Sequence, residues 1–122
     1  MMDSVENTIS KIRQFRDERD WMQFHNHKDM AISLAIEAAE LLEHFQWKST
    51  DEANQYVATH KSEISEELAD IAIYMLELAD NLEIDIIKAI NDKLNKNATK
   101  YPVKKAKGKA TKYTHLWVQN DK

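Results

Sequence analysis

The chain has 122 residues and no cysteine, which excludes a disulfide framework and a thiolate metal site. It has only one glycine and one proline, with 43% hydrophobic and 31% charged residues, which predicts one all-α domain with few tight turns. No apolar run approaches the ~20 residues of a membrane span, and we find no signal-peptide pattern, so we expect a cytoplasmic protein.

The charge is unevenly distributed along the chain. Residues 100–122 carry seven lysines and one aspartate, a net charge of +6, so the total of −4 leaves −10 for residues 1–99. An acidic body suits cation binding, but acidic solvated helix faces are common. The lysine run contains no interleaved aromatic residues, so we interpret residues 103–122 as a solvated tail rather than a nucleic-acid-binding arm.

The first two predicted helices span about residues 4–24 and 28–47. Asp3 or Ser4 is the expected N-cap of the first, and Asn26 can cap the second. The second helix is apolar on two sides, and the side away from its acidic residues carries Ala31, Ile32, Ala35, Ile36, Ala39 and Leu42. Because a short helix with two apolar sides needs a second surface to bury, this pattern predicts self-association.

The sequence pattern of the second half of the chain predicts two more main helices. Residues 48–60 are interpreted as a loop followed by a short polar helix, and further helices are expected over about residues 61–80 and 85–100. Tyr101-Pro102 ends the last of these, because the residue before a proline disfavours helical backbone. The elements together predict a four-helix-type bundle over residues 1–102 that is completed by homo-oligomerisation.

Two pairs of acidic residues lie within apolar stripes. Glu37 and Glu40 are three residues apart on one predicted helix, and Glu67 and Asp70 are three apart on another, so each pair shares a helix face. Solvated faces of glutamate-rich helices produce the same spacing, but acids on an apolar stripe are costly to bury unless they are paired or hold a cation. Four converging carboxylates therefore predict a site for a hard divalent cation.

The ligand types narrow the choice of metal. Di-iron sites in helical bundles need a Glu-x-x-His motif on two helices. None of the five histidines has a glutamate three residues before it, so coordination by oxygen alone favours Mg²⁺, with Mn²⁺ possible.

Other residues have the chemistry to bind a phosphorylated, aromatic ligand. Lys93 and Asn97 continue an inward stripe on the fourth helix, where a lysine and an amide can hold phosphate oxygens. Trp21 and Trp47 are the predicted ends of consecutive helices; core packing is the more common role for tryptophan, and stacking on a base is the alternative. His25 is one turn after Trp21.

Tyr74 is one turn after Asp70, so its hydroxyl can reach a ligand, with packing as an equal alternative.

Several strings in chain order resemble the MazG-like all-α nucleoside triphosphate pyrophosphohydrolases, and within them the dCTP pyrophosphatase group most closely. The resemblance covers about residues 5–102. The strings are Glu18-Arg19-Asp20-Trp21-Met22-Gln23-Phe24-His25, Glu37-Ala38-Ala39-Glu40-Leu41 leading into Phe45-Gln46-Trp47-Lys48, Glu66-Glu67-Leu68-Ala69-Asp70-Ile71, and Lys100-Tyr101-Pro102.

The resemblance implies a role for each matching residue. The metal ligands and catalytic acids would be Glu37, Glu40, Glu67 and Asp70. Substrate would be bound by Trp21, His25 and Trp47 in a nucleoside pocket, by Tyr74 and Asn97, and by Lys93 near the phosphates. It further implies a dimer or a dimer of dimers. Some relatives have a histidine where this chain has Ile12-Arg13-Gln14, which bears on base preference.

The function that the resemblance implies is Mg²⁺-dependent hydrolysis of a (deoxy)nucleoside triphosphate, dCTP or a related dNTP, to the monophosphate and pyrophosphate. Its role would be to remove unwanted nucleotides from the cellular pool. A carboxylate would accept the proton of the attacking water, and Glu40 is the working choice. Two alternatives stay open: a non-catalytic nucleotide- or cation-binding module, and a nucleic-acid binder that uses the basic tail.

Overall fold

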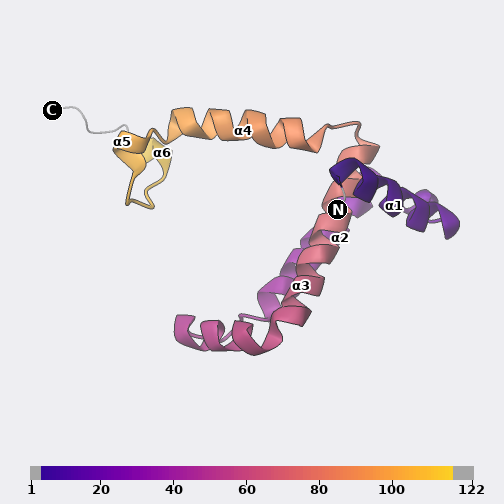
Figure 1. Cartoon of the computed structure of the whole chain (residues 1–122), viewed down its shortest axis with the longest axis horizontal. Coiled ribbons are helices and arrows are strands. Elements are labelled where there is room, and N and C mark those ends of the chain that lie inside the picture. Colours follow the sequence, from indigo (N-terminus) through magenta and orange to yellow (C-terminus); the bar gives the residue numbers. More distant parts are fainter. Residues whose placement is uncertain (1–3, 117–122) are drawn as a thin grey trace. The chain divides into compact units, whose positions relative to one another are not determined.

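The computed structural model describes residues 4–116, and every regular element in that range is a helix (Figure 1). The predicted all-α class is therefore confirmed. The helices are α1 (Val5–Glu18), α2 (His27–Glu43), α3 (Thr50–Asn81), α4 (Ile86–Lys100), α5 (Val103–Ala106) and α6 (Tyr113–Leu116), with one 3₁₀ turn, η1 (Met22–Phe24). None of these helices combines the length and apolar character that crossing a membrane requires.

The chain forms two compact units, one ending at Ile84 and the next beginning at Asp85. In the first unit α2 packs along α3, and α1 contacts α3 (Figure 1). The second unit holds α4, α5 and α6. The expected separation of a catalytic domain over residues 1–102 from a tail remains a prediction.

Side-chain caps fix where the four main helices begin. In each case a side-chain oxygen accepts a hydrogen bond from the backbone N–H three residues later, which satisfies an otherwise unpaired donor of the first turn. The caps are Ser4, Asn26, Ser49 and Asp85. The predicted cap at Asn26 is confirmed, and Ser4 rather than Asp3 caps α1.

Two helices are shorter than the sequence predicts. The first ends at Glu18 instead of near residue 24, because Asp20 has a left-handed backbone with φ of 55°. The second ends at Glu43 rather than at Trp47, whose φ is 67°. Such positive φ values cannot continue a right-handed helix, so each marks a turn that hydrophobic periodicity alone does not reveal.

The third predicted helix is longer than expected. The predicted polar helix before residue 60 and the predicted helix after it join into α3, with a kink at His60, where φ is −125° and ψ is 26°. Beyond α4, the lysine-rich segment forms the short helices α5 and α6. The remainder of the predicted tail, residues 117–122, lies outside the described residues.

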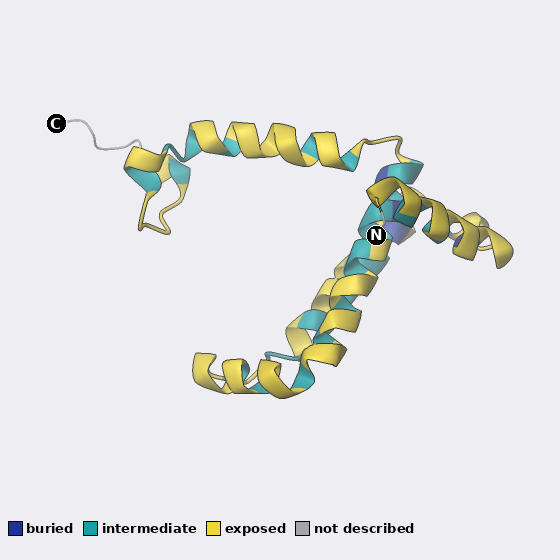
Figure 2. Cartoon of the chain, in the orientation of Figure 1, coloured by how far each residue is buried: buried dark blue, intermediate teal, exposed yellow. Residues whose placement is uncertain are grey.

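The first unit contains very little fully buried apolar surface (Figure 2). Over residues 4–116, Met30 and Ala79 are the only buried hydrophobic residues, at 1% and 6% exposure. Two charged residues, Arg16 and Glu77, are also buried, at 8% and 3% exposure. The space where α1, α2 and α3 meet therefore encloses polar chemistry as well as apolar packing.

Candidate active site

Carboxylates from α2 and α3 converge where these two helices pack together. Glu37 on α2 and Glu67 and Asp70 on α3 each place one oxygen within 4.8 Å of the others. Glu37 and Glu67 are half-buried, whereas Asp70 is exposed. Glu40 is not part of this set, but its carboxylate acts electrostatically on both Glu37 and Glu67. The structure therefore brings together three of the four predicted ligands and places the fourth close to them.

Two carboxyl groups of this acidic centre, which comprises Glu37, Glu67 and Asp70, have raised pKa values. Burial, and then the neighbouring Glu40, raise the pKa of Glu37 from its usual 4.5 to about 7, with Asp70 and Glu67 adding to the effect. Burial and Glu40 also raise the pKa of Glu67. Repelling carboxylates that hold protons when empty are suited to exchange those protons for a divalent cation.

A histidine and a tyrosine that the sequence analysis did not select support this centre from one side. The hydroxyl of Tyr56 and Nδ1 of His44 lie 2.6 Å apart, and Nε2 of His44 is 3.8 Å from Oε1 of Glu67. Nζ of Lys48 donates a hydrogen bond to the His44 carbonyl at 2.7 Å and lies 4.3 Å from the Tyr56 ring centroid. These contacts hold His44 beside Glu67, and the electrostatic effect of His44 partly opposes the raised pKa of that acid.

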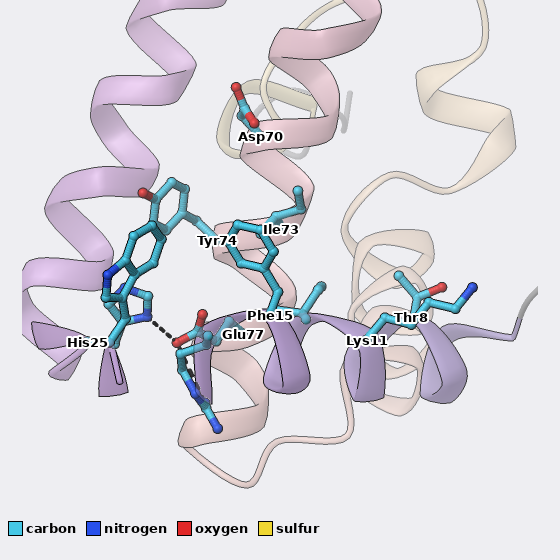
Figure 3. Close-up of a pocket in the computed structure, with 11 residues that line it drawn as sticks. Thr8, Lys11, Phe15, His25, Asp70, Ile73, Tyr74 and Glu77 are labelled. Carbon is cyan, nitrogen blue, oxygen red and sulfur yellow. Dashed lines mark hydrogen bonds and ion pairs between the residues drawn. The ribbon is translucent and has the colours of Figure 1, made fainter. Parts of the chain in front are cut away.

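A separate, mainly apolar pocket of about 420 Å³ lies between α1 and α3 (Figure 3). This volume is in the usual range for a small-molecule site. Its lining residues are Thr8, Lys11, Ile12, Phe15, Arg16, Trp21, His25, Asp70, Ile73, Tyr74 and Glu77. Because Asp70 also belongs to the acidic centre, the pocket and the carboxylates are adjoining parts of one site.

The pocket collects some of the predicted substrate residues but not all of them. Trp21, His25 and Tyr74 line it, with the Trp21 ring centroid 6.3 Å from that of His25. Trp47 does not line it and is 91% exposed. Lys93 and Asn97 lie on α4 in the second unit. The roles of all these residues in substrate binding stay predictions.

One wall of the pocket is a buried polar cluster around Glu77, which the sequence analysis missed (Figure 3). Oε2 of Glu77 lies 2.6 Å from Nδ1 of His25 and 3.7 Å from Nη1 of Arg16. The only sequence signal was an acid within the apolar run Tyr74–Ala79. Such a residue is costly to bury without partners, and here it has them.

The comparisons with known proteins agree with this geometry. The family model described as the MazG-like family matches residues 32–116, a range that contains all four acids. The chain belongs to the MazG-like family. The resemblance expected from the sequence is thereby confirmed.

Curated relatives match the MazG-like chain over most of its length. dCTP pyrophosphatase 1 of Rattus norvegicus is 38% identical over 119 residues, which cover 93% of this chain and 70% of that protein. dCTP pyrophosphatase 1 of Homo sapiens is 35% identical over 119 residues, which again cover 93% of this chain and 70% of that protein. A crystal structure of a pyrophosphatase from Archaeoglobus fulgidus DSM 4304 is similar at a TM-score of 0.79 and 44% identity, covering 84% of this chain and 95% of that one.

The side chains of this MazG-like site fit a divalent cation. Oε2 of Glu37 and Oε2 of Glu67 are shielded from solvent and have no hydrogen-bond partner within the described part of the chain. Buried acceptors that lack a donor are rare in folded proteins and need an explanation. Hard oxygen ligands of this kind are the ones that Mg²⁺ and Mn²⁺ prefer.

Proposed function

We propose that this protein hydrolyses dCTP or a closely related deoxynucleoside triphosphate to the monophosphate and pyrophosphate, using Mg²⁺ held by its acidic centre. The observation that carries the proposal is the convergence of Glu37, Glu67 and Asp70 beside a pocket that contains Trp21 and His25. Carboxylates next to an apolar, aromatic pocket suit a ligand with a phosphate end and a base end.

The class of enzyme rests on family membership together with the relatives. Curated relatives at 35% to 38% identity are dCTP pyrophosphatases, and a solved structure at 44% identity is a pyrophosphatase. The chain is accordingly a nucleoside triphosphate pyrophosphohydrolase. Which base and which sugar the substrate carries, and which metal ion the enzyme uses, are parts of our proposal.

Glu37, Glu67 and Asp70 would hold the metal, with Glu40 beside them. When bound, Mg²⁺ would neutralise phosphate oxygens and make water a better nucleophile. In the reaction, a water oxygen bonds to a phosphorus of the α–β anhydride, the anhydride bond breaks, and pyrophosphate leaves. Glu40 would complete the predicted ligand set, and we assign it as the acceptor of the water's proton because it lies beside the three converging carboxylates.

The rest of the substrate would be held by side chains outside the acidic centre. Trp21, His25 and Tyr74 would contact the nucleoside in the pocket they line. Trp47 would stack on the base, and its exposed ring is free to do so. Asn97 would contact the substrate and Lys93 the phosphates.

The proposal includes a dimer or a dimer of dimers. The face of α2 away from the acids is exposed, with Ile36 at 53% and Leu42 at 66%. Over residues 4–116, eighteen large hydrophobic residues on several helices are more than a third exposed. Exposed apolar surface of this extent on a small helical protein favours association with a second copy.

The test is a panel of NTPs and dNTPs, assayed for pyrophosphate with and without Mg²⁺. We expect release from dCTP or a near relative, and near-complete loss of activity in Glu37→Gln or Asp70→Asn without unfolding. Glu66→Gln is the matched control, because Glu66 is an exposed acid of α3 outside the converging set.

Three results would count against the proposal. Metal binding with no turnover of any nucleotide would favour a non-catalytic binding module. Steeply salt-dependent nucleic-acid binding that is lost on deleting residues 103–112 would favour the basic-tail alternative. Full activity in Glu37→Gln at saturating Mg²⁺ would remove Glu37 from the site.

A further inference from the structure

The buried carboxylate of Glu77 has no part in the acidic centre, yet it faces the pocket. Glu77 is 3% exposed on α3 and belongs to the pocket wall. Its Oε2 lies 2.6 Å from Nδ1 of His25 and accepts a hydrogen bond from Nδ2 of Asn81 at 3.3 Å. A buried charge held this closely against one ring nitrogen determines which atoms of that ring remain for a ligand.

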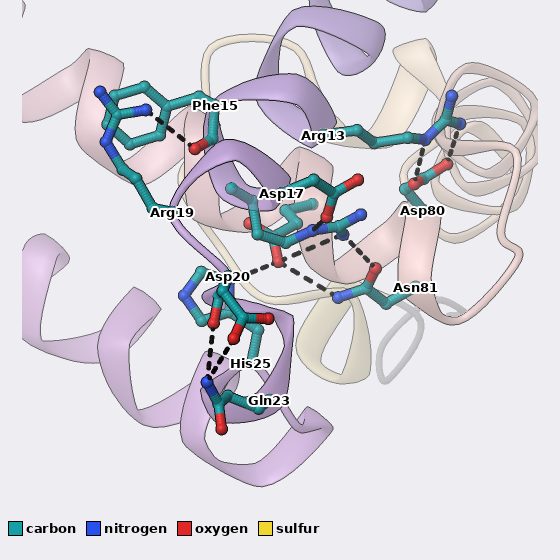
Figure 4. A network of polar contacts seen from close by, with 11 residues as sticks. Arg13, Phe15, Asp17, Arg19, Asp20, Gln23, His25, Asp80 and Asn81 are labelled. Carbon is teal, nitrogen blue, oxygen red and sulfur yellow. Dashed lines mark hydrogen bonds and ion pairs between the residues drawn. The ribbon is translucent and has the colours of Figure 1, made fainter.

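Arg16 supplies the counter-charge for Glu77. Its Nη1 is 3.7 Å from Oε2 of Glu77, and Arg16 itself is 8% exposed. Arg16 is held in place by Asp17, through a 2.8 Å bond from Nε, and by Asn81, through a 3.1 Å bond from Nη1; Figure 4 labels these two partners. Arg16 therefore shares its charge between Asp17 and Glu77, and the contact from His25 to Oε2 of Glu77 is shorter than the one from Arg16.

In a neutral His25 ring, the hydrogen bond to Glu77 fixes the tautomer. A carboxylate can only accept, so Nδ1 of His25 carries the proton that lies between them. In a neutral ring with Nδ1 protonated, Nε2 is a hydrogen-bond acceptor. Nε2 has no hydrogen-bond partner within residues 4–116, and His25 lines the pocket beside Trp21 (Figure 3).

We propose that Glu77 is a positioning residue that makes His25 present Nε2 to the pocket as an acceptor, and so selects a nucleoside with a donor group at that point. The donor is an N–H or O–H group, supplied either by the exocyclic amino group of the base or by the 3′-hydroxyl of the sugar. This inference rests on the proposed function for its ligand, but the tautomer of His25 does not depend on activity.

The tautomer is measured directly by NMR of ¹⁵N-histidine-labelled protein at neutral pH, without nucleotide or metal. The signal of His25 is assigned by its loss in His25→Gln. We expect the Nδ1–H tautomer in the wild-type protein and the Nε2–H tautomer, the usual form of a neutral histidine side chain in water, in Glu77→Leu. Glu77→Gln should keep the Nδ1–H form, because its amide oxygen still accepts a hydrogen bond.

The kinetic arm measures discrimination rather than rate. With dCTP, dUTP and 2′,3′-dideoxy-CTP as substrates, we expect Glu77→Leu to lower one ratio of kcat/KM by about 5- to 10-fold, the worth of one hydrogen bond. A fall in the dCTP/dUTP ratio assigns the amino group as the donor. A fall in the dCTP/dideoxy-CTP ratio assigns the 3′-hydroxyl. Glu77→Gln should restore most of the lost discrimination.

Asp80→Asn is the matched control. It disrupts the contact of Asp80 with Arg13 between the same two helices, but neither residue lines the pocket. It should lower the melting temperature while leaving both the tautomer and the kcat/KM ratios unchanged.

Two outcomes would overturn the inference. One is an Nε2–H tautomer or an imidazolium for wild-type His25. The other is a Glu77→Leu variant whose two ratios change no more than those of Asp80→Asn. If no nucleotide releases pyrophosphate from the wild-type protein, the proposed function fails, and the NMR arm still decides the state of His25.

Discussion

Glu37 on α2 and Glu67 on α3 each hold one carboxylate oxygen, Oε2, away from solvent and without a hydrogen-bond donor in the described chain. Both also belong to the set of acids whose oxygens lie within 4.8 Å of one another. The folded protein thus retains an electrostatic cost at the interface of these two helices. A ligand that removes the cost should stabilise the fold.

We therefore expect Mg²⁺ to raise the melting temperature of the wild-type protein. At one hundred times its Kd, a ligand that binds only the folded state adds about 2.7 kcal/mol to the free energy of unfolding. Glu67→Gln should reduce the shift, because a neutral amide is a weaker ligand than a carboxylate, and Glu66→Gln should keep it. An unchanged melting temperature of the wild type at saturating Mg²⁺ would show that the carboxylates do not form a metal site.

Glu37 makes the stability of the metal-free protein dependent on pH. Burial raises its folded-state pKa to about 7 from the ordinary 4.5, so between these values the folded protein keeps a proton that the unfolded chain has lost. The contribution of Glu37 to stability is therefore fully present below about pH 4.5, and it is lost as the pH rises through 7. With a chelator present, melting temperatures should fall more steeply across this window in the wild type than in Glu37→Gln.

Added Mg²⁺ should flatten that dependence at neutral pH, because the metal binds the carboxylate form. Equal slopes for the wild type and Glu37→Gln would mean that Glu37 ionises normally in the folded state.

The exposed face of α2 gives a prediction about assembly. Ile36→Glu and Leu42→Glu place a charge on side chains that are 53% and 66% exposed in the single chain, so neither should destabilise an isolated monomer. If the face is an interface, each variant should instead give monomers or aggregate, because the charge would be buried without a partner. Analytical ultracentrifugation at micromolar concentration measures the result.

Ser10→Glu, on the exposed surface of α1, is a control for added charge. A wild-type protein that sediments as a well-folded monomer would contradict the prediction.

The acidic centre could be predicted from the sequence because it depends on local regularity. Spacing of three residues fixes which acids share a helix face, and the packing of α2 on α3 then brings Glu37 to Glu67 and Asp70. The cluster at Glu77 could not be predicted in this way. Its partner His25 is 52 residues away in the chain, and their contact depends on how α1 and η1 meet α3.

The helix ends show the same division between local and long-range effects. Asn26 was predicted as a cap because its side chain bonds within its own turn. The early ends of α1 and α2 depend on left-handed backbone at Asp20 and at Trp47. Asparagine and aspartate tolerate that conformation but do not require it, and tryptophan rarely adopts it, so composition gave no reason to end either helix there.

Variants of Trp21 and Trp47, the two tryptophans at these turns, can tell whether each residue packs in the core or binds substrate. Removing a large core aromatic costs about 3–5 kcal/mol of stability. Trp21 is 42% exposed and Trp47 is 91% exposed, so in the single chain neither is positioned to contribute that much. We expect Trp47→Ala to melt close to the wild type but to raise KM by about 5- to 150-fold, the equivalent of 1–3 kcal/mol for a base stacked on an aromatic ring. Trp21→Ala should show a smaller KM effect and some loss of stability, because its ring also packs against Phe15 at 5.7 Å.

A further variant separates the backbone of Trp47 from its ring. Trp47→Gly should melt above Trp47→Ala, because glycine adopts a φ of 67° without the steric penalty of a β-carbon. Both variants lack the indole ring, so they should share the same raised KM and the same blurred discrimination between dNTPs. Phe24→Ala, which removes an aromatic side chain that is 61% exposed and does not line the pocket, should leave KM unchanged. The measurements are melting curves and kcat/KM for several dNTPs in each tryptophan variant. A large drop in melting temperature with unchanged base preference would assign both tryptophans to packing. Stacking on the substrate requires instead a small drop in melting temperature with altered base preference.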